Sequence, residues 1–272
     1  MSESAVTIRA QELLHELAGP QAEFREGQIG AIRALAEDRG RVLVVQRTGW
    51  GKSAVYLITT KILREAGADP TILVSPLLAL MRNQIAMASR LGVRADTINS
   101  SNAEEWERVE AAILGDEVDL LLIAPERFAN RRFQDQVMPV IGSRIGLVVI
   151  DEVHCISDWG HDFRPNYLRL RHILDRLPEG IPVVGTTATA NDRVVADVAG
   201  QLGTSLVLHR GGLARSGLAL HVFRLPDPAE RLAWLVQALQ VLPGTGIVYC
   251  LTIHDVDRVT AWLQRHGITA AA

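Results

Sequence analysis

A glycine-rich hexapeptide is the part of the sequence best suited to do chemistry. Its residues are Thr48, Gly49, Trp50, Gly51, Lys52 and Ser53. It follows an apolar run at residues 42–45 and precedes a segment of helical period that runs to Ala66. Glycines let backbone N–H groups turn inward around phosphate oxygens, and the start of a helix adds its positive end. Lys52 is expected to reach the β and γ phosphates of a nucleotide, and Ser53 to ligate Mg²⁺.

The scarcity of lysine supports this interpretation. Only Lys52 and Lys61 are lysines among 28 basic residues, so the chain uses arginine almost everywhere else. A lysine inside the loop therefore indicates that a slim ammonium group is needed there. An ordinary glycine-rich turn before a helix is the alternative, and Gln46 stands where the general P-loop pattern has its first glycine.

An acidic pair, Asp151 and Glu152, ends a second apolar run at residues 147–150. In a parallel sheet, this pair and the glycine-rich loop would lie at the same carboxyl edge, where ligands bind. Asp151 is then expected to meet Mg²⁺ through water, and Glu152 to orient and polarise the water that attacks the γ phosphate. The pair alone would equally fit a solvated turn. Together with the loop it predicts nucleoside triphosphate hydrolysis.

The sequence around these residues predicts an α/β fold. Short apolar or β-branched runs alternate with segments of helical period, which is typical of a mainly parallel sheet covered by helices. The expected strands are residues 42–45, 71–74, 95–98, 120–123, 147–150 and 182–185. The expected helices include residues 10–18 and 170–177, each with apolar residues at helical spacing.

Near residue 210 the pattern changes, and Gly211 and Gly212 indicate a linker over residues 211–217. We expect one lobe at residues 1–210 and an incomplete second lobe at 218–272. The second part is expected to contain strands at residues 220–225 and 247–250 and two helices, which are too few to close an α/β domain of normal size.

Composition excludes several classes of protein. The 272 residues carry 31 acidic and 28 basic side chains and show no apolar run of the length that a membrane span needs. With no signal peptide pattern either, the expected location is cytoplasmic. The two cysteines, Cys155 and Cys250, exclude a four-cysteine zinc site and are expected to be core thiols. Residues 102–119 hold seven acidic residues and one arginine, so the remainder is slightly basic and a polyanionic partner is not excluded.

These motifs together resemble a superfamily 2 helicase, and more specifically the RecQ family of ATP-dependent DNA helicases. The resemblance extends from about residue 24 to 250 and rests on ordered motifs. They comprise Phe24, Arg25, Gly27 and Gln28; residues 48–53; Ser75, Pro76, Leu77, Leu80 and Gln84; Asn99 and Ser100; residues 124–127; residues 151–154; residues 155–165; Thr187, Ala188 and Thr189; and residues 246–250.

The resemblance implies a RecA-like P-loop lobe followed by part of a second one, with ATP and Mg²⁺ as cofactors and single-stranded and duplex DNA as partners. It implies that Arg25 and Gln28 contact adenine, that His154 links the ATP site to the adjacent loop, and that Thr187 and Thr189 couple hydrolysis to lobe movement. The residues that it assigns to DNA are Ser75, Pro76, Gln84, Asn99, Ser100, Trp159, Phe163 and Arg164. Aromatic faces and guanidinium planes stack on any base without reading sequence.

The function implied by this resemblance is 3′ to 5′ translocation on single-stranded DNA with duplex unwinding, in DNA repair and recombination. One alternative is a module that binds ATP and single-stranded DNA but does not unwind. Others are an RNA helicase of the same superfamily and a plain P-loop kinase, against which the order of motifs after Asp151 argues. Family members also receive arginines from the second lobe, which stabilise the transferring phosphoryl group.

Overall fold

The computed structural model describes residues 4–76, 78–98, 106–157, 170, 174, 177–203, 205–212 and 219–272. The chain divides into two compact units, Met1–Arg215 and Ser216–Ala272. Each unit is described by itself.

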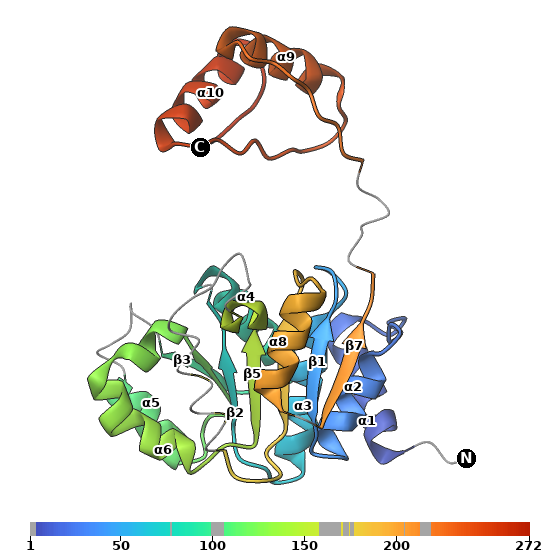
Figure 1. The fold of residues 1–272 in the computed structure, drawn as a ribbon, viewed down its shortest axis with the longest axis vertical. Coiled ribbons are helices and arrows are strands. Elements are labelled where there is room, and N and C mark those ends of the chain that lie inside the picture. Colours follow the sequence, from blue (N-terminus) through green and yellow to red (C-terminus); the bar gives the residue numbers. More distant parts are fainter. Residues whose placement is uncertain are drawn as a thin grey trace. The chain divides into compact units, whose positions relative to one another are not determined.

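The first unit is built on a sheet whose described strands all run parallel (Figure 1). The strands are β1 (Arg41–Val45), β2 (Thr71–Val74), β3 (Ala95–Ile98), β4 (Leu120–Ile123), β5 (Leu147–Asp151), β6 (Val183–Thr187) and β7 (Leu206–Arg210). Their order across the sheet is β3-β4-β2-β5-β6-β1-β7. This confirms the expected parallel α/β fold and the six expected strands. Strand β7 was not predicted; it pairs with β1 at the edge of the sheet, and its half-exposed residues lead directly into the glycines taken as a linker.

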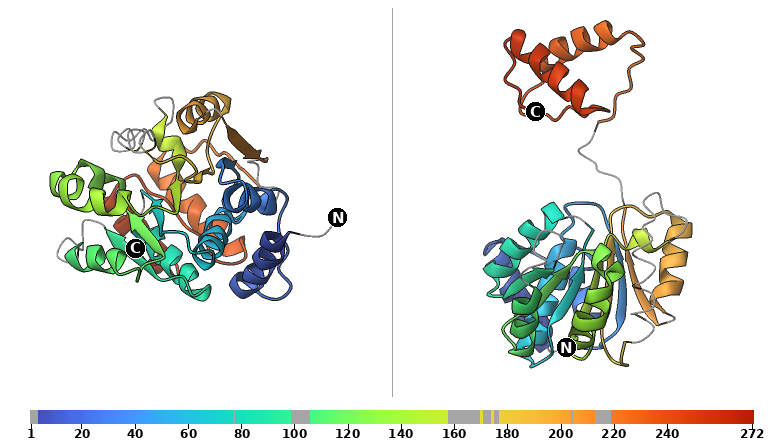
Figure 2. Two further views of the ribbon diagram at one scale, coloured as in Figure 1. Left: turned by 90° about the horizontal axis from the view of Figure 1, so that it is seen from below. Right: turned by 90° about the vertical axis from the view of Figure 1, so that its left-hand side faces the viewer.

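Helices cover both faces of this sheet (Figures 1 and 2). One face carries α1 (Ala5–Ala18), α2 (Gln28–Ala36), α3 (Lys52–Glu65) and α4 (Leu78–Arg90). The other carries α5 (Trp106–Leu114), α6 (Met138–Gly142) and α8 (Asp192–Leu202). The helices expected at residues 10–18 and after the glycine-rich loop are confirmed. Of the segment at 170–177, Leu170 and Leu174 are described and buried.

Alternate residues of the strands belong to two hydrophobic cores, one on each face of the sheet. In β4, Leu121 and Ile123 pack against the helices of one face, whereas Leu120 and Leu122 pack against those of the other. A strand buried on both faces needs apolar residues at every position, so it forms a continuous apolar run rather than an alternating one. This is why these strands were predictable from composition.

The strand order creates the crevice in which the site lies. The chain leaves β1 and crosses to β2, and the gap between them is filled later by β5 and β6. A reversal of this kind leaves an opening at the carboxyl edge of a parallel sheet. The segments that follow β1, β5 and β6 therefore meet at that edge.

The second unit contains α9 (Pro228–Val241) and α10 (Ile253–Arg265), capped by the side chains of Asp227 and Thr252. Both expected helices are confirmed. The strands predicted at 220–225 and 247–250 are wrong, because neither segment forms a strand within described residues 219–272. A strand needs a neighbour to accept its backbone hydrogen bonds, and Val222 and Tyr249 are instead 87% and 90% exposed.

Two further expectations concern the cysteines and membrane-spanning helices. Cys155 is buried as expected, whereas Cys250 is only half-buried, and both are free thiols. Among the helices that the structure describes, none combines the length and apolarity needed to cross a bilayer.

Candidate active site

The glycine-rich loop joins β1 to α3 in the conformation that a phosphate-binding loop needs. Gly49 and Gly51 adopt φ angles of 83° and 97°, in the left-handed region that favours glycine. A Cβ on Gly51 would lie 2.5 Å from Nε2 of Gln28, so a larger residue would also collide there. Lys52 and Ser53 follow immediately in the first turn of α3, where backbone N–H groups have no partner within the helix.

Lys52 is held against its own loop. Its Nζ donates to the carbonyl oxygen of Gln46 at 2.8 Å and lies 3.4 Å from that of Arg47. These carbonyls keep the ammonium at the mouth of the loop. Lys52 and Ser53 are both half-buried and both line the cavity described below.

Arg25 and Gln28 contact the glycine-rich loop directly. Gln28 is 4% exposed; its Oε1 accepts from the backbone N–H of Arg25 at 2.8 Å, and its Nε2 donates to the Trp50 carbonyl at 2.8 Å. The Arg25 guanidinium donates to the Gly49 carbonyl. The structure thus places both residues beside the loop, where they fix its shape, and their contact with adenine remains a prediction.

Asp151 ends β5 inside the crevice and is 8% exposed. Its Oδ1 accepts from the Thr186 hydroxyl at 2.7 Å and from the Glu152 backbone N–H at 3.1 Å, and its Oδ2 accepts from Nε2 of Gln84 at 3.2 Å. Burial raises the pKa of this carboxyl, and the nearby Glu152 charge raises it further. A carboxylate held by donors on both oxygens is fixed in orientation.

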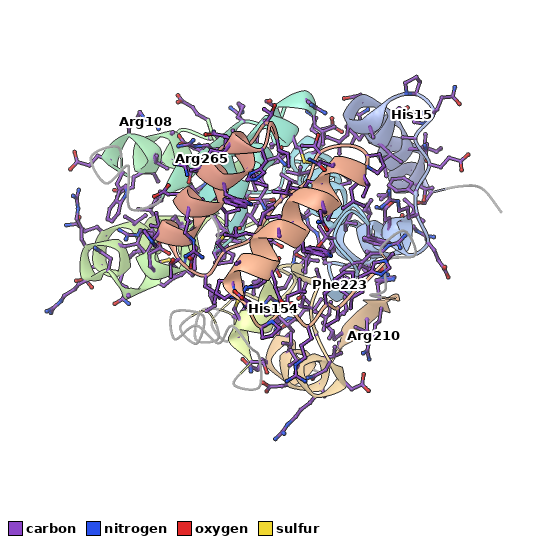
Figure 3. The ribbon with its side chains drawn as sticks, turned by 90° about the horizontal axis from the view of Figure 1, so that it is seen from above. His15, Arg108, His154, Arg210, Phe223 and Arg265 are labelled. Atoms are coloured by element: carbon purple, nitrogen blue, oxygen red, sulfur yellow. The ribbon has the colours of Figure 1, made fainter. Side chains whose placement is uncertain are left out.

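Glu152, His154 and Thr187 form a polar chain beside Asp151. Nδ1 of His154 lies 3.2 Å from Oε2 of Glu152 and 2.9 Å from the Thr187 hydroxyl oxygen, which also accepts from the Thr189 backbone N–H at 3.1 Å. Hydrogen bonds with Cys155 and Glu152 raise the pKa of His154 to about 10. His154, which follows β5 in the chain, is labelled in Figure 3. These hydrogen-bonded side chains connect the residues that follow β5 to the end of β6.

These groups surround a cavity of about 580 Å³. Its polar end is formed by the loop together with Gln84, Asp151 and Glu152, and its apolar wall includes Leu14, Leu17, Ala18 and Met87. The size is typical of a cofactor site. Backbone donors, an ammonium, a hydroxyl and a carboxylate at one end, with an apolar wall beside them, fit a nucleoside triphosphate with its Mg²⁺.

A protein-family model described as DEAD/DEAH box helicase matches residues 25–198, which include every group of this cavity except the α1 wall and Ala22 and Glu23. The chain belongs to the DEAD/DEAH box helicase family. The expected helicase resemblance is therefore confirmed.

Relatives of this helicase chain include RecQ-type proteins. It is 34% identical over 91% of its length to a putative ATP-dependent DNA helicase Q1 of Caenorhabditis briggsae, and covers 41% of that protein. It is also 34% identical to the ATP-dependent DNA helicase RecQ of Bacillus subtilis, over 96% of this chain and 43% of that one. The chain thus spans about two fifths of the length of these relatives.

The DUF1998 helicase MrfA is similar in fold, with a TM-score of 0.70 at 16% identity over 97% of this chain and 41% of that one. A structure of MrfA bound to DNA has also been solved.

The residues assigned to DNA contact by resemblance lie in different parts of this helicase chain. Gln84, expected to contact DNA, is 4% exposed and lines the cavity described above. Ser75 is fully buried, and Pro76 beside it is half-buried. Asn99, Ser100, Trp159, Phe163 and Arg164 lie outside the described residues.

Two site residues were missed. Tyr56 is 1% exposed and accepts from Nε2 of Gln84 at 3.0 Å, and Thr186 holds Asp151. Tyr56 follows Ser53 by three residues on α3, a spacing that places both on one helix face. Thr186 pairs in register with Asp151, which depends on β6 lying next to β5. Only the helical spacing was available as a signal in the sequence.

Proposed function

We propose that the chain binds MgATP in this cavity and hydrolyses it as the motor lobe of a RecQ-like DNA helicase. The observation that carries the proposal is the convergence of Lys52, Ser53, Asp151 and Glu152 on one cavity from separate segments of the chain. Two of these groups come from the loop after β1 and two from the end of β5.

The chain's own groups have distinct tasks in this mechanism. Lys52 and the N–H groups at the start of α3 bind and orient the β and γ phosphates, and Ser53 and Asp151 would hold Mg²⁺. When bound, Mg²⁺ neutralises charge that develops on the phosphate oxygens. Glu152 accepts a hydrogen bond from the attacking water and polarises it. Arg25 and Gln28 would recognise the adenine.

Coupling to movement is assigned to the polar chain from Glu152 to Thr189. Nδ1 of His154 is within hydrogen-bond reach of both Glu152 and Thr187. A displacement of the Glu152 side chain would therefore change the position of Thr187 at the end of β6. Thr187 and Thr189 then carry that displacement toward the DNA-binding segments. We assign DNA contact to Pro76, Asn99, Ser100, Trp159, Phe163 and Arg164, and propose 3′ to 5′ translocation and unwinding in the cytoplasm, serving DNA repair and recombination.

A binding and turnover experiment with two variants tests the proposal. Lys52→Ala should lower affinity for MgATP by at least tenfold, because it removes the group that binds the β and γ phosphates. Glu152→Gln should retain binding and lower turnover by about 10²-fold or more. Binding is measured by calorimetry and turnover by phosphate release, each with and without single-stranded DNA.

Lys61→Ala is the matched control. Lys61 lies on the same helix, α3, forms an ion pair with Glu65 at 3.4 Å, and does not line the cavity. It should bind and hydrolyse MgATP like the unchanged chain. Nucleotide binding that survives Lys52→Ala unaltered would disprove the assignment of the site.

A further inference from the structure

Gln84 is a buried amide that connects three parts of the nucleotide cavity. It lies on α4, is 4% exposed, and directs its Nε2 to the hydroxyl oxygen of Tyr56 at 3.0 Å and to Oδ2 of Asp151 at 3.2 Å. The hydroxyl of Tyr56 is in turn hydrogen-bonded with the side chain of Ser53. Gln84 therefore contacts Asp151 directly and is linked to Ser53 through the Tyr56 hydroxyl, and these are the two residues assigned to Mg²⁺.

Asp151 fixes the orientation of this amide. Of the two polar atoms of the amide, only Nε2 can donate to a carboxylate, so Nε2 must face Asp151. A flipped amide would set its oxygen against Oδ2, which would leave two acceptors facing each other at 3.2 Å. The carbonyl oxygen Oε1 therefore lies on the other side of the amide.

That carbonyl oxygen is buried and, among the described residues, has no hydrogen-bond partner. Buried polar atoms in native proteins are nearly always hydrogen-bonded, because losing water without gaining a partner is costly. Gln84 also lines the cavity, so a bound molecule can supply the missing donor. The donor must suit the polar end of the cavity, where Asp151 lies.

Phosphate oxygens are acceptors and cannot fill this role, and the adenine is assigned to Arg25 and Gln28 rather than to the part of the cavity beside Asp151. A water bound to a divalent cation directs its hydrogens outward, and Mg²⁺ usually keeps several such waters. We propose that Oε1 of Gln84 accepts a hydrogen bond from a water in the coordination shell of the nucleotide's divalent cation. Gln84 is then a positioning residue that holds the Asp151 carboxylate with one end of its amide and the hydrated cation with the other. This inference rests on the proposed binding of MgATP.

Replacement by leucine tests this role because it keeps the size of the side chain and removes the amide. The measurement is affinity for ADP by calorimetry, once with excess Mg²⁺ and once in EDTA. Outer contacts to a metal's ligands typically contribute about 10–100-fold in metal affinity. In Gln84→Leu, the gain in ADP affinity from Mg²⁺ should therefore fall by about tenfold or more, while affinity in EDTA stays at the unchanged chain's value.

Gln136→Leu provides the matched control, since Gln136 is exposed and does not line the cavity. It should keep the full Mg²⁺ dependence. Circular dichroism checks that each variant folds, and Gln84→Met, which also lacks the amide, replaces the leucine variant if that one fails to fold. Displacement of Mn²⁺ from the ADP complex, followed by electron paramagnetic resonance, gives a second readout of cation affinity.

Two results would overturn the inference. One is an unchanged gain from Mg²⁺ in the Gln84 variants, and the other is an equal loss of ADP affinity with Mg²⁺ and in EDTA, which would indicate a packing role alone. Failure of the proposed function gives a different pattern, because the unchanged chain would then bind no nucleotide or bind it independently of Lys52. That pattern would remove the basis of both proposals.

Discussion

At the scale of single residues, Glu152 is held in an unusual backbone conformation. Its φ of 50° lies in the left-handed region, which residues other than glycine rarely adopt. Such a conformation costs free energy and persists where surrounding structure enforces it, often at active sites. Here β5 ends at Asp151 and a short helix begins at Val153, so Glu152 makes the turn between them. The turn brings the Glu152 carboxylate to His154.

The charge state of His154 predicts a pH dependence of stability. Hydrogen bonds with Cys155 and Glu152 raise its pKa from 6.5 to about 10. Because the folded state binds this proton more tightly, its contribution is fully present below about pH 6.5 and is lost as pH rises toward 10. In thermal unfolding from pH 6 to 10, the melting temperature of the chain should exceed that of His154→Gln most at the acidic end.

His254→Gln supplies the comparison for this series, since His254 is exposed on α10. Its difference from the unchanged chain should show no such decline with rising pH. A His154→Gln difference that stays constant, or grows toward pH 10, would contradict the raised pKa.

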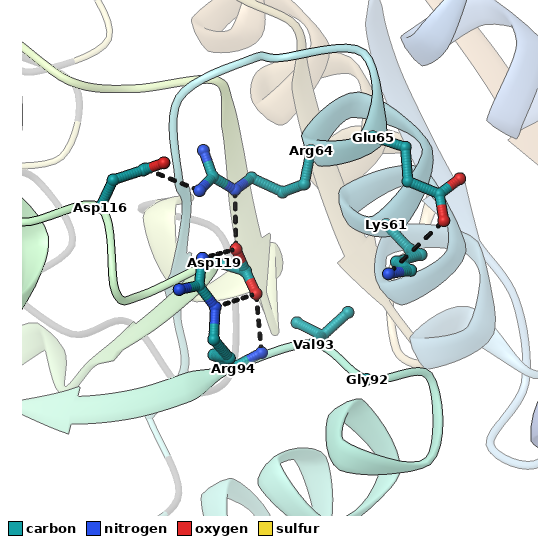
Figure 4. A pocket seen from close by; sticks show the side chains of 8 residues that line it. All are labelled: Lys61, Arg64, Glu65, Gly92, Val93, Arg94, Asp116 and Asp119. Carbon is teal, nitrogen blue, oxygen red and sulfur yellow. Dashed lines mark hydrogen bonds and ion pairs between the residues drawn. The ribbon is translucent and has the colours of Figure 1, made fainter.

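At the scale of elements, an ionic cluster ties α3 to the amino ends of β3 and β4 (Figure 4). Asp119 accepts from Nε of Arg64 at 2.8 Å and from the side chain and backbone N–H of Arg94, at 2.7 to 2.9 Å. Arg64 also donates to Asp116 at 2.6 Å. Burial alone would raise the pKa of Asp119, but the donors from both arginines outweigh it and lower the pKa to about 2.

Removing the centre of this cluster should destabilise the first unit. Asp119 is 8% exposed, and Asp119→Ala would leave two guanidinium groups without their shared acceptor. Arg64 is 12% exposed and Arg94 is 52% exposed, so solvent compensates for part of the lost interaction. Hydrogen bonds to charged groups contribute about 1.5–3 kcal/mol, and a loss of about 2 kcal/mol in the free energy of unfolding is expected. Urea unfolding followed by circular dichroism measures it.

Asp116→Asn is the control, because the Asp116 side chain is 52% exposed, its ion pair is screened by solvent, and asparagine tolerates the left-handed φ of 58° at this position. Its cost should stay below about 1 kcal/mol. Equal losses in the two variants would show that the burial of Asp119 does not determine the strength of the cluster.

The elements differ in how far the sequence could predict them. Strands buried on both faces, such as β4, were recognisable as apolar runs, and the glycine-rich loop was recognisable from its own sequence. The half-exposed β7 lacked that signal, and residues 220–225 and 247–250 have strand composition without a strand neighbour. Motif order placed Gln84 with the DNA-binding residues, but its place beside Asp151 depends on how α4 packs over the sheet. No local pattern contains that information.

At the scale of the whole molecule, the second unit exposes an unusual amount of apolar surface. Leu220, Val222, Ile247, Tyr249 and Leu251 are between 79% and 100% exposed. Exposed apolar residues in this number mark surfaces that take part in further packing. Together with the greater length of the relatives, this supports the proposal that residues 218–272 belong to a second RecA-like lobe. The same proposal explains why strand composition occurs there without strands.

This organisation predicts that the 272-residue chain by itself turns over ATP slowly. The RecQ resemblance extends to residue 250, and the second-lobe arginines that it implies for stabilising the transferring phosphoryl group are not among the matched motifs. Such an arginine contributes about 10³–10⁵ in rate. Phosphate release with saturating MgATP and single-stranded DNA should therefore stay about 10³-fold or more below the 1–100 s⁻¹ typical of kinases, although nucleotide binding is intact.

The Glu152→Gln variant, purified in parallel, corrects this measurement for contaminating ATPases. A DNA-stimulated rate above about 1 s⁻¹ that disappears in Glu152→Gln would contradict the prediction. Such a rate would mean that this chain stabilises the transferring phosphoryl group without a second-lobe arginine. Arg25, whose guanidinium donates to the Gly49 carbonyl, would be the first to replace. A slow rate with intact binding would instead assign the missing stabilisation to residues beyond the first lobe.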